Sequence, residues 1–402
     1  MTGPLLLQDC GVVTPLGRGK LATARSLFAG ARDGITERED LIPGRRVSVG
    51  AVAGDLPPPP TRQAHLDCRN NRLLQVALEE IGPAIEAAID RYGRDRVAII
   101  LGTSTSGIES GEVALASFRQ TGQWPAGFHY HKQEISGPST FAAELLGITG
   151  PAYTVATACS SSAKVFGSAR RLIRAGLVDA AIVGGVDTLC RMTLNGFDAL
   201  ELVSQHRCNP FSVNRDGLTI GEGAAVFLMT AEASPDANAA PIAFLGLGEA
   251  SDAHHLTAPH PDGRGARDAM LLALADAGLG AEDIAYINLH GTATVLNDAM
   301  EARGVAAVFG AETPCSSTKG MTGHMLGATG GCEAAFLWLT LHPVFNRGVL
   351  PPHIWDKVHD PAFPRLNLVD VGTPLRHSSP TAMLSNSFGF GGSNVALIMG
   401  TS

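Results

Sequence analysis

Residues 152–187 have the sequence AYTVATACSSSAKVFGSARRLIRAGLVDAAIVGGVD, which predicts a β–α–β unit. AYTVATAC and DAAIVGGVD are apolar enough to form strands, and SAKVFGSARRLIRAG between them predicts a helix that Gly176 ends. Within that helix, Phe166, Ala169 and Ile173 recur at spacings of three and four, which is the helical period. The unit places Cys159 at the point where a strand becomes a helix.

Cys159 is a candidate nucleophile because of this position. A helix N-terminus lowers the pKa of a thiol through the macrodipole and the unpaired N–H groups. The small neighbours Ala158, Ser160 and Ser161 leave room for a substrate. The alternative is a buried, inert cysteine, which is the commoner role of this residue type. We expect that inert role for the other cysteines, which are Cys10, Cys68, Cys190, Cys208, Cys315 and Cys332.

Strands and helices alternate on both sides of a segment of different composition. Residues 231–241, AEASPDANAAP, are rich in Ala, Pro, Asp and Asn and mark the best internal boundary. After it, RDAMLLALADAGL and NDAMEARGVAAVFG predict helices around the strand IAYINLHGTAT, and TAMLSNSFGFGGSNVALIM predicts two strands around a glycine turn. We therefore expect an α/β fold with two halves, 1–240 and 241–402, and parallel sheets covered by helices.

Composition excludes several classes of protein. The chain has 402 residues and a net charge of −8, which argues against nucleic acid as the main partner. We find no secretory signal in the first residues and no apolar run of about 18 residues that predicts a membrane span. The cysteines are odd in number, scattered and without a C-x-x-C pair. They predict a reducing cytoplasm, no disulfide framework and no cysteine zinc site.

His290 stands at the end of a predicted strand and is followed by GTAT. Ligands bind at strand C-termini in α/β sheets, so His290 is a candidate site residue. Asp298 and Glu301 follow on a predicted helix, where a spacing of three puts them on one face. The alternatives are an ordinary surface histidine and solvated surface carboxylates.

Two glycine-rich segments complete the candidate site. Lys319 and His324 lie in STKGMTGHMLGATGG, where His324 precedes a predicted helix and is well placed to meet a helix-end cysteine from the other half. The alternative for Lys319 is a solvated loop charge. In SNSFGFGGSN, a glycine turn around Phe390 can aim a backbone N–H at a developing oxyanion, although an ordinary hairpin turn has the same composition.

Taken in order, these motifs resemble the β-ketoacyl-acyl-carrier-protein synthases, the condensing enzymes of fatty-acid and polyketide synthesis. The resemblance rests on TACSSS, HGTAT, KGMTGHMLGATG and NSFGFGGSN, with NRDGLTIGEGAAVFLM and GVVTPLG in support, and covers essentially the whole chain. TLCRMTLNGFDALELVS is more similar to the ketosynthases of bacterial aryl-polyene clusters. Two positions depart from the family pattern: Val295 replaces a common proline, and Asn209 a frequent arginine.

The resemblance implies a thiolase-like fold, with two pseudo-duplicated α/β halves in α-β-α-β-α layers. It implies decarboxylative Claisen condensation of an acyl thioester on Cys159 with a malonyl group on an acyl carrier protein, which extends the chain by two carbons. It also implies a homodimer, or a heterodimer with a ketosynthase paralogue. No bound cofactor or metal is expected, because the carrier protein supplies the phosphopantetheine arm.

The resemblance also assigns roles to residues. His290 and His324 would assist loss of CO₂ and stabilise the enolate, while Glu301 would be the acidic partner of Lys319. The backbone N–H groups of Cys159 and Phe390 would form the oxyanion hole, with Phe390 as a gate to the acyl pocket. The hydroxyls of Thr292 and Thr294 would bind the phosphopantetheine arm. Three arginines near the pocket mouth would dock the carrier protein, namely Arg69, Arg72 and Arg207.

Four alternatives stay open at this point. A chain-length factor that only shapes its partner's pocket would lack the cysteine, whereas Cys159 is present. A thiolase would carry a second catalytic cysteine near its C-terminus, and a Cys-His-Asn starter synthase would lack a histidine at the place of His324. A cysteine hydrolase would need only Cys159 and one histidine, and would release a free acid.

Overall fold

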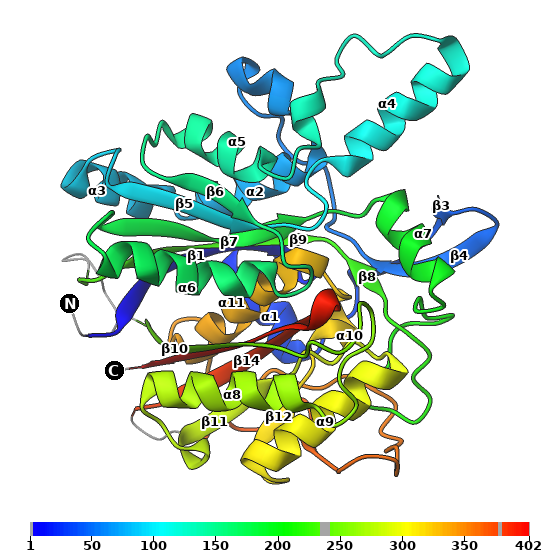
Figure 1. Cartoon of the computed structure of the whole chain (residues 1–402), viewed down its shortest axis with the longest axis vertical. Coiled ribbons are helices and arrows are strands. Elements are labelled where there is room, and N and C mark those ends of the chain that lie inside the picture. Colours follow the sequence, from blue (N-terminus) through cyan, green and yellow to red (C-terminus); the bar gives the residue numbers. More distant parts are fainter. Residues whose placement is uncertain (1–2, 234–241, 377–379, 402) are drawn as a thin grey trace.

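The computed structural model describes residues 3–233, 242–376 and 380–401, and its strands repeat one order in two halves (Figure 1). In each half the first three strands are parallel neighbours and the next two pairings are antiparallel. The first half has the order β6 (Ala152–Val155), β5 (Val97–Gly102), β7 (Ala180–Asp187), β9 (Gly223–Thr230) and β1 (Leu5–Thr14). The second has β12 (Pro314–Ser316), β11 (Ile284–Asn288), β14 (Ala382–Gly389), β15 (Ser393–Thr401) and β10 (Ile242–Ser251).

The sheet halves are mixed, so the expectation of parallel sheets is wrong. β14 and β15 are joined only by Phe390–Gly392, and a connection this short holds two neighbouring strands antiparallel. β1 and β10 also pair antiparallel, with Leu5 opposite Phe244, and this pairing joins the two halves. The predicted boundary between residues 240 and 241 lies outside the described residues and stays a prediction.

Helices and sheet halves alternate in five layers, which confirms the expected thiolase-like arrangement (Figure 1). The middle layer is α6 (Ser161–Arg174) with α11 (Thr329–Leu341), and its core includes residues of both sheet halves. Separate hydrophobic cores lie under the outer layers. Over the first half these are α2 (Arg69–Glu80), α3 (Gly82–Tyr92) and α5 (Gly137–Leu146), and over the second α8 (Arg264–Ala277) and α9 (Val295–Phe309).

The two middle helices meet at their N-terminal ends because small residues stand there. A β-carbon on Gly330 would lie 2.8 Å from the β-carbon of Ala163, so only glycine allows this approach. The backbone N–H of Gly331 donates to the hydroxyl of Ser162 at 2.7 Å. α11 is buried along its whole length, as expected for a helix that is apolar on every side. The loops that precede α6 and α11 are therefore brought face to face.

The remaining elements lie around this body. A small sheet of β3, β4 and β8 packs with α7, and α4 extends away from the layers (Figure 1). Within the described ranges, no helix has the length and apolarity needed to cross a lipid bilayer. The bounds are β2 (Gly17–Arg18), α1 (Lys20–Ala29), β3 (Ile35–Ile42), β4 (Arg45–Gly50), α4 (Ile108–Thr121), α7 (Arg191–Ala199), β8 (Ile220–Gly221), α10 (Lys319–Thr322) and β13 (Asn367–Leu368).

Candidate active site

Cys159 lies on a tight turn between β6 and α6. Ala158, directly before it, has a left-handed backbone with φ of 53°, which costs a non-glycine residue about 1 kcal/mol. The hydroxyl of Ser161 fixes this turn, since it accepts the N–H of Thr157 at 2.8 Å and donates to the carbonyl of Ala158 at 2.6 Å. This turn directs the Cys159 side chain toward the second half of the molecule.

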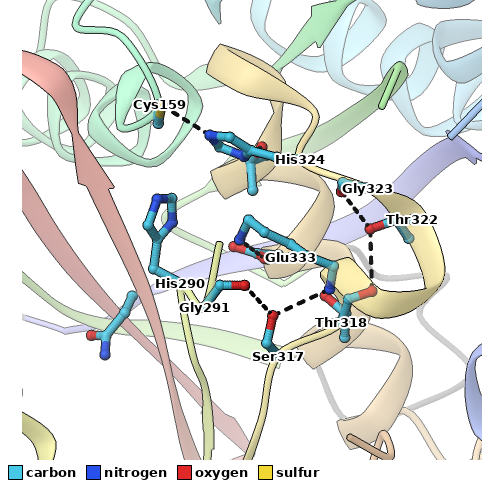
Figure 2. A network of polar contacts seen from close by, with 12 residues as sticks. Cys159, His290, Gly291, Ser317, Thr318, Thr322, Gly323, His324 and Glu333 are labelled. Atoms are coloured by element: carbon cyan, nitrogen blue, oxygen red, sulfur yellow. Dashed lines mark hydrogen bonds and ion pairs between the residues drawn. The ribbon is translucent and has the colours of Figure 1, made fainter. Parts of the chain in front are cut away.

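His324 meets Cys159 from the loop before α11, as the sequence predicts (Figure 2). Its Nε2 lies 3.0 Å from the Cys159 sulfur, although the two residues are 165 positions apart. Nδ1 of the same ring lies 3.0 Å from the hydroxyl of Thr329, which fixes the ring orientation. Thr329 is a site residue that the sequence reasoning missed, because only the fold shows which group faces Nδ1.

His290 completes the group from the loop after β11. Its ring is nearly perpendicular to that of His324, with ring centroids 5.2 Å apart. Burial lowers the pKa of both histidines well below its ordinary value, and the positive charge of Lys319 lowers it further. Both imidazoles are therefore neutral near pH 7 and can donate or accept a hydrogen bond.

The pKa of Cys159 is raised to about 11, which corrects the expectation of a lowered value. Burial is the largest cause, because only 7% of the residue is exposed. Lys319 and the backbone N–H groups of Phe390 and Cys159 oppose this effect without cancelling it. The resting group is a thiol, so its attack on a substrate needs a base, and His324 is within reach.

Lys319 pairs with Glu333 and not with Glu301, which corrects the expected pairing of Lys319 with Glu301. Nζ of Lys319 lies 2.6 Å from the Glu333 carboxylate, and the two side chains are 1% and 0% exposed. Glu333 projects from α11, one of the few polar groups on that helix. Burial raises the pKa of Glu333 to about 7, against the lowering effect of Lys319.

The Glu301 carboxylate is occupied elsewhere. It accepts the backbone N–H groups of His290 and Gly291, each at 2.7 Å, and the side-chain amide of Asn386 at 3.1 Å. Glu301 therefore fixes the loop that carries His290. Asp298, on the same helix face, is also buried and accepts the backbone N–H of Phe211 at 2.7 Å, so neither carboxylate is a surface charge.

Phe390 lies on the turn between β14 and β15, beside Cys159. Its backbone N–H is directed at the Cys159 sulfur and lowers the pKa of that thiol. The Phe390 ring lies 5.5 Å from that of Phe197, between centroids, and the two rings line cavities on both sides of the cysteine.

One cavity connects the two histidines and Cys159 to the surface. Thr292 and Thr294 line it, with their hydroxyl oxygens 3.0 Å apart. Leu256 and Val295 stand at its mouth, 74% and 59% exposed. A second cavity lies beyond Cys159 and Phe390, and its lining includes Ile135, Ala156, Thr193, Phe197 and Leu326. A chain attached to Cys159 thus has an apolar cavity beside it, in addition to the channel.

Asp187 holds the two halves together beneath this site, and the sequence reasoning missed it. Its carboxylate accepts the hydroxyls of Thr103 and Thr105, each at 2.7 Å, and the backbone N–H of Ala328 at 2.9 Å. Burial raises its pKa, while the hydrogen bonds from Thr103 and Thr105 lower it. A single acidic residue at the end of an apolar strand is the one sequence signal that could have identified it.

The three arginines expected at the pocket mouth differ in their contacts. Arg69 forms an ion pair with the buried Glu222 at 2.5 Å, and Arg72 pairs with Asp67 at 2.6 Å. Arg207 is exposed. Two of the three guanidinium groups are therefore engaged within the chain.

Family models and curated relatives match this chain. The model for the β-ketoacyl synthase N-terminal domain matches residues 10–234, and that for the C-terminal domain matches 243–355. A 3-oxoacyl-[acyl-carrier-protein] synthase 2 from Staphylococcus aureus is 33% identical over 345 residues, which cover 82% of this chain and 84% of the relative.

Solved structures match over nearly the full length. The ketosynthase ApeO, in complex with its chain length factor ApeC from Xenorhabdus doucetiae, has a TM-score of 0.92 and 45% identity over 99% of this chain and 98% of that chain. The ishigamide ketosynthase/chain length factor has a TM-score of 0.87 and 27% identity over 99% of both chains. The chain belongs to the β-ketoacyl synthase family.

Proposed function

We propose that the chain condenses an acyl group held on Cys159 with a malonyl group delivered by an acyl carrier protein. The observation that carries this assignment is the 3.0 Å contact between the Cys159 sulfur and Nε2 of His324, inside a pocket that also holds His290. Family membership supplies the reaction class, and this contact supplies the nucleophile and its base.

In the first half-reaction the thiol of Cys159 attacks the acyl thioester while His324 accepts the thiol proton. The backbone N–H groups of Cys159 and Phe390 stabilise the oxyanion of the tetrahedral intermediate. The carrier's pantetheine sulfur then leaves and takes the proton back from His324. The acyl chain extends into the apolar cavity beyond Phe390.

In the second half-reaction the malonyl carboxylate leaves as CO₂, and its bonding electrons form an enolate. Burial and Lys319 keep both rings uncharged, so each ring has one N–H to donate to the enolate oxygen. For His324 this N–H is on Nε2, since the Thr329 hydroxyl can donate to Nδ1 as well as accept from it. The enolate carbon attacks the Cys159 thioester, the thiolate leaves, and protonation restores the thiol. Thr292 and Thr294 line the channel where the pantetheine arm would lie.

Mass spectrometry of the carrier protein tests this assignment. Incubation with acyl- and malonyl-loaded carrier should give a carrier-bound β-ketoacyl product two carbons longer than the primer. Free acid without a longer product would favour a cysteine hydrolase. A product that forms only after a paralogous ketosynthase is added, and that still forms when Cys159 is replaced by Ala, would favour a pocket-shaping subunit.

We further propose that the working unit is a dimer, either with a second copy or with a chain length factor. The second option is supported by the 45% identity to a ketosynthase solved with its chain length factor, and by the resemblance to aryl-polyene ketosynthases. Large apolar side chains are exposed on and near α4 and on the edge strand β6, among them Val113, Trp124, Tyr130 and Tyr153. Co-purification of the chain with a tagged paralogue, compared with the chain alone, distinguishes the two dimers.

A cytoplasmic location completes the proposal. The cysteines found in the structure are all buried and free, which agrees with a reducing compartment. Cell fractionation with an antibody against the chain tests the location directly.

A further inference from the structure

The group that would carry out the condensation also has the composition and spacing of a metal site. The sulfur of Cys159 and one ring nitrogen each of His290 and His324 lie within 4.8 Å of one another, and all three residues are buried (Figure 2). Within the described part of the chain, this is the one group of three Cys, His, Asp or Glu side chains whose ligand atoms lie close enough together to hold a metal ion. The sequence contains no C-x-x-C pair that would indicate this metal site, because its three residues come from both halves of the fold.

Thiolate sulfur and neutral imidazole nitrogen are the ligands that Zn²⁺ and related soft divalent cations prefer. With Zn–S near 2.3 Å and Zn–N near 2.0 Å, two ligand atoms on one tetrahedral ion lie about 3.3–3.6 Å apart. The 3.0 Å separation of the Cys159 sulfur from Nε2 of His324 is close to this range. Small side-chain movements are therefore sufficient to close the group around an ion.

The surroundings of the histidines favour metal binding. The hydroxyl of Thr329, 3.0 Å from Nδ1 of His324, can accept that N–H and so leave the Nε2 lone pair free for an ion. Nδ1 of His290 has no hydrogen-bond partner among the described residues, so no hydrogen bond at that nitrogen fixes the tautomer. The nearby Lys319 is itself paired with Glu333, since its Nζ lies 2.6 Å from that carboxylate.

We propose that unacylated Cys159, together with His290 and His324, binds a thiophilic divalent cation of the Zn²⁺ class, which blocks acyl loading. Binding replaces the thiol proton with a sulfur–metal bond, and the proton passes to solvent. All three residues line the open channel, which can supply water or another small ligand as the fourth ligand. Acylation removes the sulfur as a ligand, so the loaded enzyme is protected. The blocking of loading rests on the proposed function, whereas metal binding does not.

Cd²⁺ is a suitable probe, because a cadmium–thiolate bond absorbs in the ultraviolet. Titration of the metal-free, full-length protein should give a charge-transfer band that saturates at one Cd²⁺ per chain, and Zn²⁺ should displace it. Cys159→Ala should abolish the band, as should alkylation of Cys159 in the wild-type protein, which tests the site without a substitution. Cys68→Ser is the matched control, because Cys68 is the N-cap of α2, where serine is favoured.

Thr329→Val tests the positioning role of that hydroxyl. Loss of such an outer contact typically weakens metal affinity about 10–100-fold, so the variant should bind Cd²⁺ more weakly while keeping the same band. A band that persists after alkylation or in Cys159→Ala, or that disappears in Cys68→Ser, would overturn the inference. If the protein catalyses condensation but gives no cadmium–thiolate band, the proposed metal site is wrong. If it gives the band but does not catalyse condensation, the proposed function is wrong.

Discussion

The loops that precede the two middle helices occupy equivalent places in the two halves but supply different chemistry. Before α6 the chain makes one tight turn, which carries Cys159. Before α11 it makes a longer excursion through α10, which carries Lys319 and then His324. The shared strand order fixes where both loops lie, and loop length and composition decide what each one does. A duplicated scaffold thus gives one nucleophile and one set of groups that act on it.

The largest expected effect separates these two contributions. Cys159→Gln removes the nucleophile of the first loop and leaves the histidines of the second half, so we expect no β-ketoacyl product. Its amide oxygen can occupy the oxyanion hole, and the variant should still release CO₂ from malonyl-loaded carrier well above the uncatalysed rate. Adding His324→Ala should reduce that release about 10²–10³-fold, since the enolate loses a donor.

A CO₂-release assay coupled to mass spectrometry of the carrier measures both products. Release from the single variant no faster than in buffer would show that the histidines do not act on the malonyl group. Continued β-ketoacyl synthesis would show that Cys159 is not the nucleophile.

The next effect concerns the ion pair below the second loop. Lys319→Met leaves the Glu333 carboxylate buried without its partner, which should lower the free energy of unfolding by about 3–5 kcal/mol. Lys319→Met combined with Glu333→Gln removes both charges and should recover much of this loss. Urea unfolding of the three proteins measures it. Unchanged stability of Lys319→Met, with condensation abolished, would mean that Lys319 acts directly on the substrate.

Glu301→Gln should have a smaller effect on stability. One oxygen of the carboxylate is replaced by an amide NH₂, so one of the backbone N–H groups of His290 and Gly291 loses its acceptor. A buried donor left without a partner costs about 1–3 kcal/mol. Because the loop carrying His290 loosens, decarboxylation by a Cys159→Gln background should also slow. A double-mutant cycle of Lys319→Met and Glu301→Gln tests whether the Glu333 and Glu301 carboxylates act independently. Losses in the free energy of unfolding that do not add would show that they do not.

The pH dependence tests the neutral state of the histidines. Their pKa values lie well below 6.5, so the rings stay uncharged as the pH falls from 7 to 6, and decarboxylation by Cys159→Gln should change little. In the unfolded chain both histidines take up protons near pH 6.5. Protonation therefore favours unfolding, and these groups withdraw stability as the pH falls below that value. A pH–rate profile with half of the activity lost near pH 6.5 would contradict the neutral pair.

The smallest effect is expected at the arginines proposed to dock the carrier protein. Arg207 is exposed, whereas Arg72 is held by Asp67, so Arg207→Glu should raise KM for carrier-bound substrate more than Arg72→Glu does. Small thioester mimics lack the acidic carrier surface and should be unaffected by either change. Steady-state kinetics with both substrates measures the difference. Equal effects on carrier and mimic would remove these arginines from docking.

The sequence by itself determined the elements around the site and its reacting side chains. Helical spacing and glycine turns are local signals, and they placed α6, β7 and the turn at Phe390 correctly. The meeting of Cys159 with His324 also followed, because two α/β halves bring the helix ends together.

Only the tertiary structure decided the electrostatics of that site. The family resemblance paired Lys319 with Glu301, whereas the approach of α11 to α10 selects Glu333. The helix position of Cys159 predicts a lowered thiol pKa, but burial raises it to about 11. Ion pairing and desolvation depend on which distant segments pack against a group and exclude water from it. Local sequence spacing does not show which segments those are.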